Sequence, residues 1–212
     1  MQEYLPGIEL SLELAKRQYE SELESKFLDL RPRFERLTSE ELPYPPLTEM
    51  PITAIVVLFK KVDETYELIL NESPYITNTV NQTRNSLNHA EKVAIEKAQK
   101  NRLRFQRKHL SDCILLTTVE PCAMCTEAFL HVGGKGIIFG LSQKDLRGKY
   151  IFVNGVYKPF RTEPEGYSAE KFLQERNSNM FVHGGYMKEE IWKRMEPFTY
   201  LDGEYIEDKN IL

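Results

Sequence analysis

The sequence predicts an α/β fold in which strands and helices form layers. Two observations predict it: apolar runs of strand length, and, between them, segments whose apolar residues recur at helical steps. The chain has 212 residues, enough for one sizeable core and short for two full domains. We therefore expect one globular domain over residues 1–212.

The N-terminal half contains a helix followed by a hairpin. Apolar residues recur every three or four positions over about 7–30, the stripe of an amphipathic helix. The proline-rich stretch 41–46 cannot continue a helix. The apolar run 52–59 then predicts a central strand, and a turn at 60–64 leads to a returning strand at 66–70.

The middle of the chain predicts two further helices, each beside a strand. Alanine and valine spacing indicates a helix from His89 to about Lys100, which Ser86 or Asn88 can cap. The run 113–119 predicts a strand. Pro121 then stands at a helix start, where its missing N–H costs nothing, and Gly133 and Gly134 end that helix.

The last third alternates short elements with a polar segment. Residues 142–178 are rich in glycine, proline and polar side chains, and we expect a long surface loop there. The other elements expected here are a strand over 136–140, a strand over 180–183 and a helix over 187–195.

Composition narrows the class of protein. Hydrophobic residues make up 41% and charged residues 28%, which argues against wholesale disorder. No apolar run approaches the roughly 18 residues of a membrane span. The opening Met1-Gln2-Glu3-Tyr4 carries no secretory pattern, so we expect a cytoplasmic location.

The charge is unevenly distributed. A formal net charge of −4 argues against a general nucleic-acid binder. Between Arg84 and Lys108, however, eight residues are basic and two acidic. The part from Lys97 to Lys108 is either a solvated helix end or a contact for RNA phosphates.

Two short motifs contain metal-ligand residue types. They are His89-Ala90-Glu91 and Pro121-Cys122-Ala123-Met124-Cys125, each at a predicted helix start. His89, Cys122 and Cys125 offer one imidazole and two thiolates, which leave the fourth tetrahedral position of Zn²⁺ open for water. The alternative is half of a closed structural zinc site. Cys113 lies in an apolar run, where we expect a buried structural thiol.

Glu91 is the expected proton carrier. It follows His89 by two residues, so its carboxylate is expected beside the metal without being a ligand. Such a carboxylate can take the proton of an activated water and deliver it to the nitrogen atoms of the substrate. The order H-x-E followed by P-C-x-x-C is the signature of zinc deaminases.

With these motifs the chain resembles the cytidine deaminase-like superfamily. The resembling branch contains tRNA adenosine deaminases, cytosine deaminases and guanine deaminases. Further segments similar to that branch are 14–16, 51–57, 117–125, 128–131, 137–140 and 184–190. The resemblance implies a three-layer α/β/α fold with a mixed central sheet of about five strands, a Zn²⁺ cofactor and a homodimer. It also implies a single zinc deaminase domain with an N-terminal helix and an insertion at about 24–49.

The resemblance also points to a substrate residue. The family usually has an asparagine eleven residues before its zinc-binding histidine, which gives Asn78, and Asn81 is the rival. The chain departs from the family at 85–88, where Asp-Pro-Thr is common, and at Gly133, where arginine is frequent. We interpret His131 and His183 as structural or surface residues.

Three functions are left open. The first is hydrolytic deamination of the exocyclic amine of a free nucleobase or nucleoside, which fits the acidic balance. The second is adenosine-to-inosine deamination in tRNA, which the basic run favours. The third is a non-catalytic, zinc-bearing subunit of a deaminase complex, and Glu91 speaks against it because a silent subunit needs no proton carrier.

Overall fold

The computed structural model describes most of the chain after residue 51. The described residues are 32–33, 35–37, 52–62, 65–103, 109–153, 156–160, 162–195 and 199–200. The helix predicted over 7–30 and the proline-rich stretch 41–46 lie outside them, as does most of the expected insertion at 24–49.

The main sheet has the strand order β2-β1-β4-β5-β8, and β3 pairs with β1. Its strands are β1 (Thr53–Val62), β2 (Thr65–Asn71), β3 (Ile76–Thr77), β4 (Cys113–Val119), β5 (Gly136–Leu141) and β8 (Phe181–His183). β1 is antiparallel to β2, β3 and β4, while β4, β5 and β8 are parallel. The expected mixed sheet is therefore confirmed, with the short β3 added at its margin.

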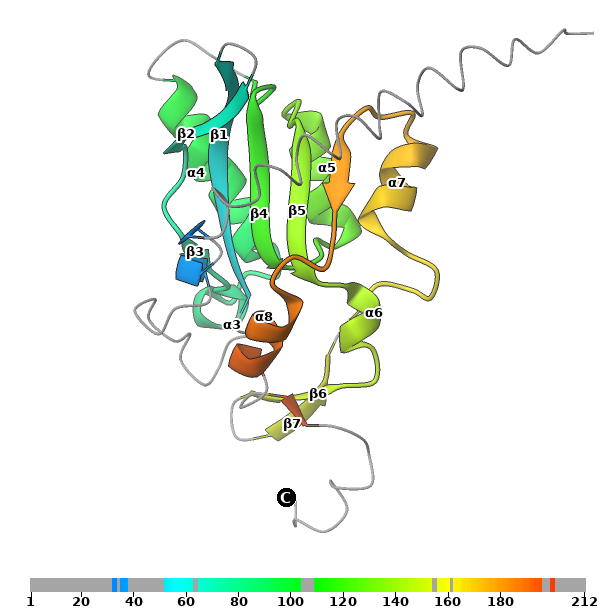
Figure 1. Cartoon of the computed structure of the whole chain (residues 1–212). Helices are drawn as coiled ribbons and strands as arrows, with labels where there is room; N and C mark the ends of the chain where they lie inside the picture. The colour runs from blue at the N-terminus through cyan, green and yellow to red at the C-terminus, as the bar shows by residue number, and fades with distance from the viewer. Residues whose placement is uncertain are drawn as a thin grey trace, which may run out of the picture.

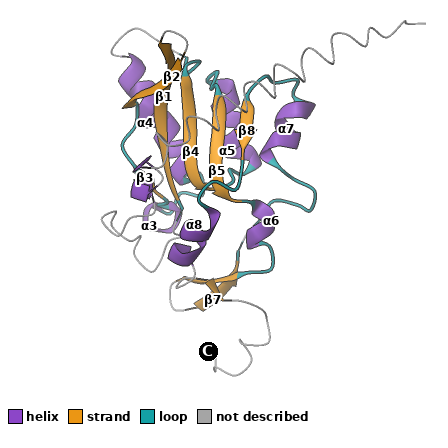
Figure 2. Cartoon of the chain, viewed as in Figure 1, coloured by secondary structure: helices purple, strands orange, loops and turns teal. Residues whose placement is uncertain are grey.

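Helices cover both faces of this sheet (Figures 1 and 2). They are α3 (Val80–Thr83), α4 (Ala90–Leu103), α5 (Ala123–His131), α6 (Gln143–Leu146), α7 (Ala169–Glu175) and α8 (Lys188–Met195). A second, small sheet has the order β7-β6-β9, formed by Val156–Pro159, Tyr150–Val153 and Thr199–Tyr200. No described helix has the length and apolar character that a membrane crossing requires.

Alternation along the strands builds two cores. In β1, Ile55 and Val57 belong to the cluster that contains Ile191 and Met195 of α8. The residues between them in sequence, such as Val56, belong to the cluster that includes the alanines of α4, Phe129 of α5 and Leu173 of α7. Because strand side chains alternate between faces, each sheet face has its own core. This arrangement confirms the three-layer α/β/α fold.

The segment 142–178 differs from the expected long loop. It contains α6, the β6–β7 hairpin and α7. Ser142 and Asp145 form a reciprocal capping box at the start of α6, and the Ser168 hydroxyl accepts the N–H of Lys171 at the start of α7. These caps stabilise short polar helices that have too few apolar residues to show a period.

The end of α5 explains one departure from the family pattern. Gly133 follows the helix with φ at +75°, in the left-handed region that favours glycine. Arginine, which the family often has here, would be strained in this conformation. The change is therefore a feature of helix termination.

Candidate active site

Helix α4 begins at the residues predicted to bind the metal and to carry the proton. His89 directly precedes the helix and Glu91 lies in its first turn. Glu91 is almost fully buried, with 3% of its surface exposed. Side-chain hydrogen bonds stabilise the loop before His89. The Asn85 side-chain amide donates to Oδ1 of Asn88 (3.1 Å), and the Asn88 side-chain amide donates to the Thr83 hydroxyl (2.9 Å).

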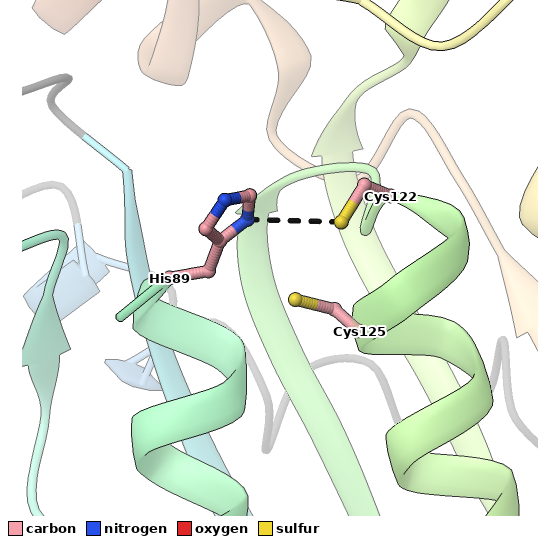
Figure 3. A group of neighbouring side chains, drawn as sticks. All are labelled: His89, Cys122 and Cys125. Carbon is pink, nitrogen blue, oxygen red and sulfur yellow. Dashed lines mark hydrogen bonds between the residues drawn. The ribbon is translucent and has the colours of Figure 1, made fainter. Parts of the chain in front are cut away.

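Helix α5 presents both thiols from its first turn. Cys122 is the N-cap residue with an extended backbone, and Cys125 lies buried three residues later. The buried strand β4 ends at Val119, three residues before Cys122, and so positions the start of α5. Figure 3 shows the imidazole of His89 and the two sulfur atoms converging between the starts of α4 and α5.

The geometry of the three side chains fits a zinc ion. Their ligand atoms all lie within 4.8 Å of one another, and Nδ1 of His89 is 3.6 Å from Sγ of Cys122. Zn–S bonds of about 2.3 Å and Zn–N bonds of about 2.0 Å place nitrogen and sulfur about 3.5 Å apart on a tetrahedron. One imidazole and two thiols are also a donor set that zinc prefers. His89, Cys122 and Cys125 could therefore hold Zn²⁺ with a fourth position open.

The surroundings shift the pKa of each group. A hydrogen bond from the Cys125 thiol lowers the pKa of Cys122 to about 4, which favours the thiolate that a metal needs. The hydrogen bond to Cys122 raises the pKa of His89. Burial, and then the charge of Cys122, raise the pKa of Glu91 to about 7. The Cys125 Sγ lies 3.9 Å from Oε2 of Glu91. A carboxyl with such a pKa can both accept and return a proton near neutrality.

Two glutamates that the sequence reasoning missed brace the thiol-bearing turn. Glu120 is buried, and its carboxylate accepts the backbone N–H groups of Gln143 and Ala169, both at 2.8 Å. Glu163 accepts the N–H of Ala123 at 2.9 Å, next to Cys122. The position of Glu120 directly before the P-C-x-x-C motif was the sequence signal that could have indicated its role. No such signal exists for Glu163, because its partner is 40 positions away in the sequence.

Tyr167 completes this bracing. Its hydroxyl donates to the Pro121 carbonyl at 2.9 Å and lies 3.0 Å from the Thr126 hydroxyl. Segment 142–169 is therefore attached to the start of α5 through Glu120, Glu163 and Tyr167. This attachment places residues from the expected loop beside the candidate zinc ligands.

Asn78 lies close to the histidine end of the site. It is buried, with 6% exposed, and its backbone N–H donates to the Ile52 carbonyl at 2.9 Å. The next residue, Thr79, donates its N–H to the Asn88 carbonyl at 3.3 Å, directly before His89. The backbone thus joins the neighbours of Asn78 and His89, Thr79 and Asn88, by a hydrogen bond. The side chain of its rival, Asn81, lies outside the described part of the structure.

The basic run is shorter than the sequence indicates, since Arg102 does not belong to an exposed surface. Its side chain is 4% exposed, and Nε lies 3.0 Å from Oε1 of Glu72 while Nη2 lies 2.6 Å from Oδ1 of Asp112. Lys97 and Lys100 are exposed. Arg104, Arg107 and Lys108 lie outside the described residues.

The remaining candidate residues lie away from the three ligand atoms. His131 ends α5 and is exposed, and His183 is partly buried in β8. Cys113 is fully buried, and burial raises the pKa of its thiol to about 12. Such a thiol stays protonated and is a poor nucleophile.

Comparison with known proteins places this site in a family. Residues 68–141 match the cytidine and deoxycytidylate deaminase zinc-binding region. The chain is 37% identical over 114 residues to the tRNA-specific adenosine deaminase of Rickettsia typhi, covering 49% of this chain and 75% of that protein. It is 34% identical over 76 residues to the cytosine deaminase of Candida albicans, covering 35% of this chain and 48% of that protein.

The match is partial for other relatives. The chain spans 57% and 64% of the tRNA-specific adenosine deaminases of Rickettsia bellii and Buchnera aphidicola, with which it shares 34% and 33% identity. The aligned parts are 44% and 50% of this chain.

A solved structure shares the fold. The guanine deaminase of Nitrosomonas europaea superposes with a TM-score of 0.51 at 21% identity, over 70% of this chain and 72% of that one. This likeness shows a common architecture. Together with the matched zinc-binding region and the Rickettsia typhi relative, it establishes that the chain belongs to the cytidine deaminase-like superfamily.

Proposed function

We propose that this protein is a zinc-dependent hydrolytic deaminase that converts the exocyclic amine of a nucleobase or nucleoside to a carbonyl and releases ammonia. One observation carries the proposal: a buried carboxyl, Glu91, lies beside three convergent zinc-type ligands at two helix starts. A closed structural zinc site needs a fourth side chain and has no use for such a carboxyl.

The residues divide the chemistry among them. Zn²⁺ held by His89, Cys122 and Cys125 would activate a water molecule at neutral pH. Glu91 would accept one proton of that water and deliver it to the ring nitrogen beside the attacked carbon. It would then take the remaining hydroxyl proton of the tetrahedral adduct and pass it to the departing amine. Water thereby supplies the new oxygen, and the C–N bond breaks to give ammonia. Asn78 is the proposed substrate-binding residue, because it is buried and the residue after it is hydrogen-bonded to the residue before His89.

Metal content tests the ligand set. We expect about one zinc per chain with one nitrogen and two sulfur ligands, since these are the donors that converge. Cys125→Ala should lose most of the metal, whereas Cys113→Ala, the control thiol, should keep it. Metal analysis and X-ray absorption spectroscopy measure both. A site with four sulfur ligands, or a purified protein that never binds zinc, would refute the assignment.

A substrate screen tests the reaction. Ammonia release is measured with cytosine, guanine, adenine, their nucleosides and a tRNA anticodon stem-loop. Turnover of a free base or nucleoside supports the proposal. Release of ammonia from none of these substrates by the zinc-loaded protein would instead favour the non-catalytic subunit. The homodimer and the cytoplasmic location stay predictions.

The second candidate function is adenosine deamination in tRNA. The observation that favours it is the 37% identity to a relative described as a tRNA-specific adenosine deaminase, over three quarters of that protein. The burial of Arg102 removes one cation from the run that would contact RNA phosphates. We therefore rank the small substrate first.

Charge reversal distinguishes the two candidates. The variant combines Lys97→Glu and Lys100→Glu, both exposed, with Arg104→Glu, Arg107→Glu and Lys108→Glu, and leaves the buried Arg102 intact. With a small substrate, kcat/KM should stay within about twofold, because an uncharged base or nucleoside has no phosphate for these five cations to bind. With tRNA, each lost phosphate contact lowers affinity and flattens its salt dependence.

The measurement pairs kinetics with RNA titrations at low and moderate salt. Weak RNA binding that does not depend on sequence supports our ranking. Tight binding to one stem-loop, inosine in that RNA and loss of both in the variant would promote the tRNA function.

A further inference from the structure

A hollow lies where α6, the residue before β6, and α8 meet. Its volume is about 550 Å³, within the range of sites that hold small ligands. The lining residues are Asp145, Lys149, Lys188, Glu189, Trp192 and Lys193. None of them belongs to the candidate zinc site.

Trp192 gives the hollow a fixed aromatic surface. It is partly buried and packs against the core cluster that contains Ile191 and Met195. The same side chain also lines the hollow. A ring held on one side by the core and open on the other suits stacking by a flat aromatic ligand.

The hollow has more positive than negative charge. Lys188 is paired with Asp145 at 2.6 Å, and Asp145 is fixed by the Ser142 hydroxyl at 2.8 Å. In the described part of the chain, Lys149 and Lys193 form no ion pair, and Glu189 is the remaining acidic group of the lining. Nζ of Lys149 lies over the Trp192 ring, 5.9 Å from its centroid, so a base that stacks on this ring must move the flexible ammonium group to the side. An anion held by Lys149 is therefore adjacent to the aromatic surface.

We propose that this hollow binds a nucleotide, with its base stacked on Trp192 and its phosphate held by Lys149 and Lys193. A phosphate monoester carries nearly two negative charges at neutral pH, which match two ammonium groups. Stacking alone does not select among aromatic ligands, so the phosphate is the group that makes the site specific. The nucleotide is either free or at the end of an RNA strand.

The single tryptophan makes the test direct. Trp192 is the only tryptophan in the chain, so intrinsic fluorescence reports on this hollow. Adenosine monophosphate should change the emission saturably. Adenosine should bind about tenfold more weakly, since it lacks the charged hydrogen bonds, and inorganic phosphate should compete. A short single-stranded RNA with a 5′-phosphate forms the second arm: if it alone binds, the strand is the source of the nucleotide.

Matched variants complete the test. Lys149→Ala combined with Lys193→Ala should weaken binding about tenfold or more, while Lys171→Ala, an exposed lysine of α7, should not. Trp192→Phe keeps a stacking ring and should retain binding by calorimetry. The titrations are repeated with Glu91→Gln to prevent turnover of the ligand. Equal binding of adenosine and its monophosphate, wild-type affinity in the double variant, or no response to either nucleotide form would overturn the proposal.

Discussion

Glu91→Gln should keep the fold and the zinc and lower kcat by about a thousandfold, the typical contribution of a positioned proton carrier. The amide preserves the shape of the buried side chain but cannot carry a proton. The three candidate ligand atoms should remain in place, because none of them comes from Glu91. Steady-state kinetics on the substrate found in the screen, with metal analysis of the same sample, measures both parts of the expectation.

The matched control is Glu96→Gln on the same helix. Glu96 is exposed and pairs with Lys92 at 2.6 Å, so its loss should leave kcat unchanged. If Glu91→Gln loses its metal, or keeps activity within a few-fold of the wild type, then Glu91 does not have the role assigned here.

Arg102→Ala should have the largest effect on stability. It would leave the buried carboxylate of Glu72 without its cationic partner, with the Asn101 amide still donating to it at 3.1 Å, and would remove the 2.6 Å contact to Asp112. Removing one member of a buried ion pair typically costs about 3–5 kcal/mol. In a chain of this size that loss lowers the Tm by roughly 10 °C. Calorimetry or denaturant unfolding measures it.

Two variants on α4 make this result interpretable. Lys100→Ala is exposed and should change the free energy of unfolding by no more than about 0.5 kcal/mol. Arg102→Lys keeps the charge without the planar fork and should fall between Arg102→Ala and the wild type. An Arg102→Ala protein within about 1 kcal/mol of the wild type would show that the hydrogen bond from the Asn101 amide is enough to stabilise the Glu72 carboxylate.

The main sheet and the candidate ligand set could be predicted because the sequence patterns that indicate them are local. The strand predicted over 113–119 coincides with β4, since all seven residues are buried and the run is uninterrupted. His89, Cys122 and Cys125 could be predicted because they are zinc-type ligands at two helix starts and their motifs match the order H-x-E followed by P-C-x-x-C.

The missed features depend on distant partners. Arg102 stands among cations in the sequence, while its carboxylate partners, Glu72 and Asp112, lie 30 and 10 positions away. Segment 142–178 has no apolar period, because its helices are one or two turns long and depend on caps. The capping residues Ser142 and Asp145 were the sequence signal for α6, but they are hard to recognise in a segment of polar composition.

The two parts of the zinc ligand set come from helices 33 positions apart in the chain, so the ligand atoms converge only in the folded protein. Any free energy of zinc binding therefore enters the folding equilibrium by mass action. Free zinc at a hundred times its Kd would add about 2.7 kcal/mol to the free energy of unfolding. If the proposed zinc site is filled in the cell, the stability of this protein depends partly on the free zinc concentration, and a cell low in zinc would hold less folded protein as well as less active protein.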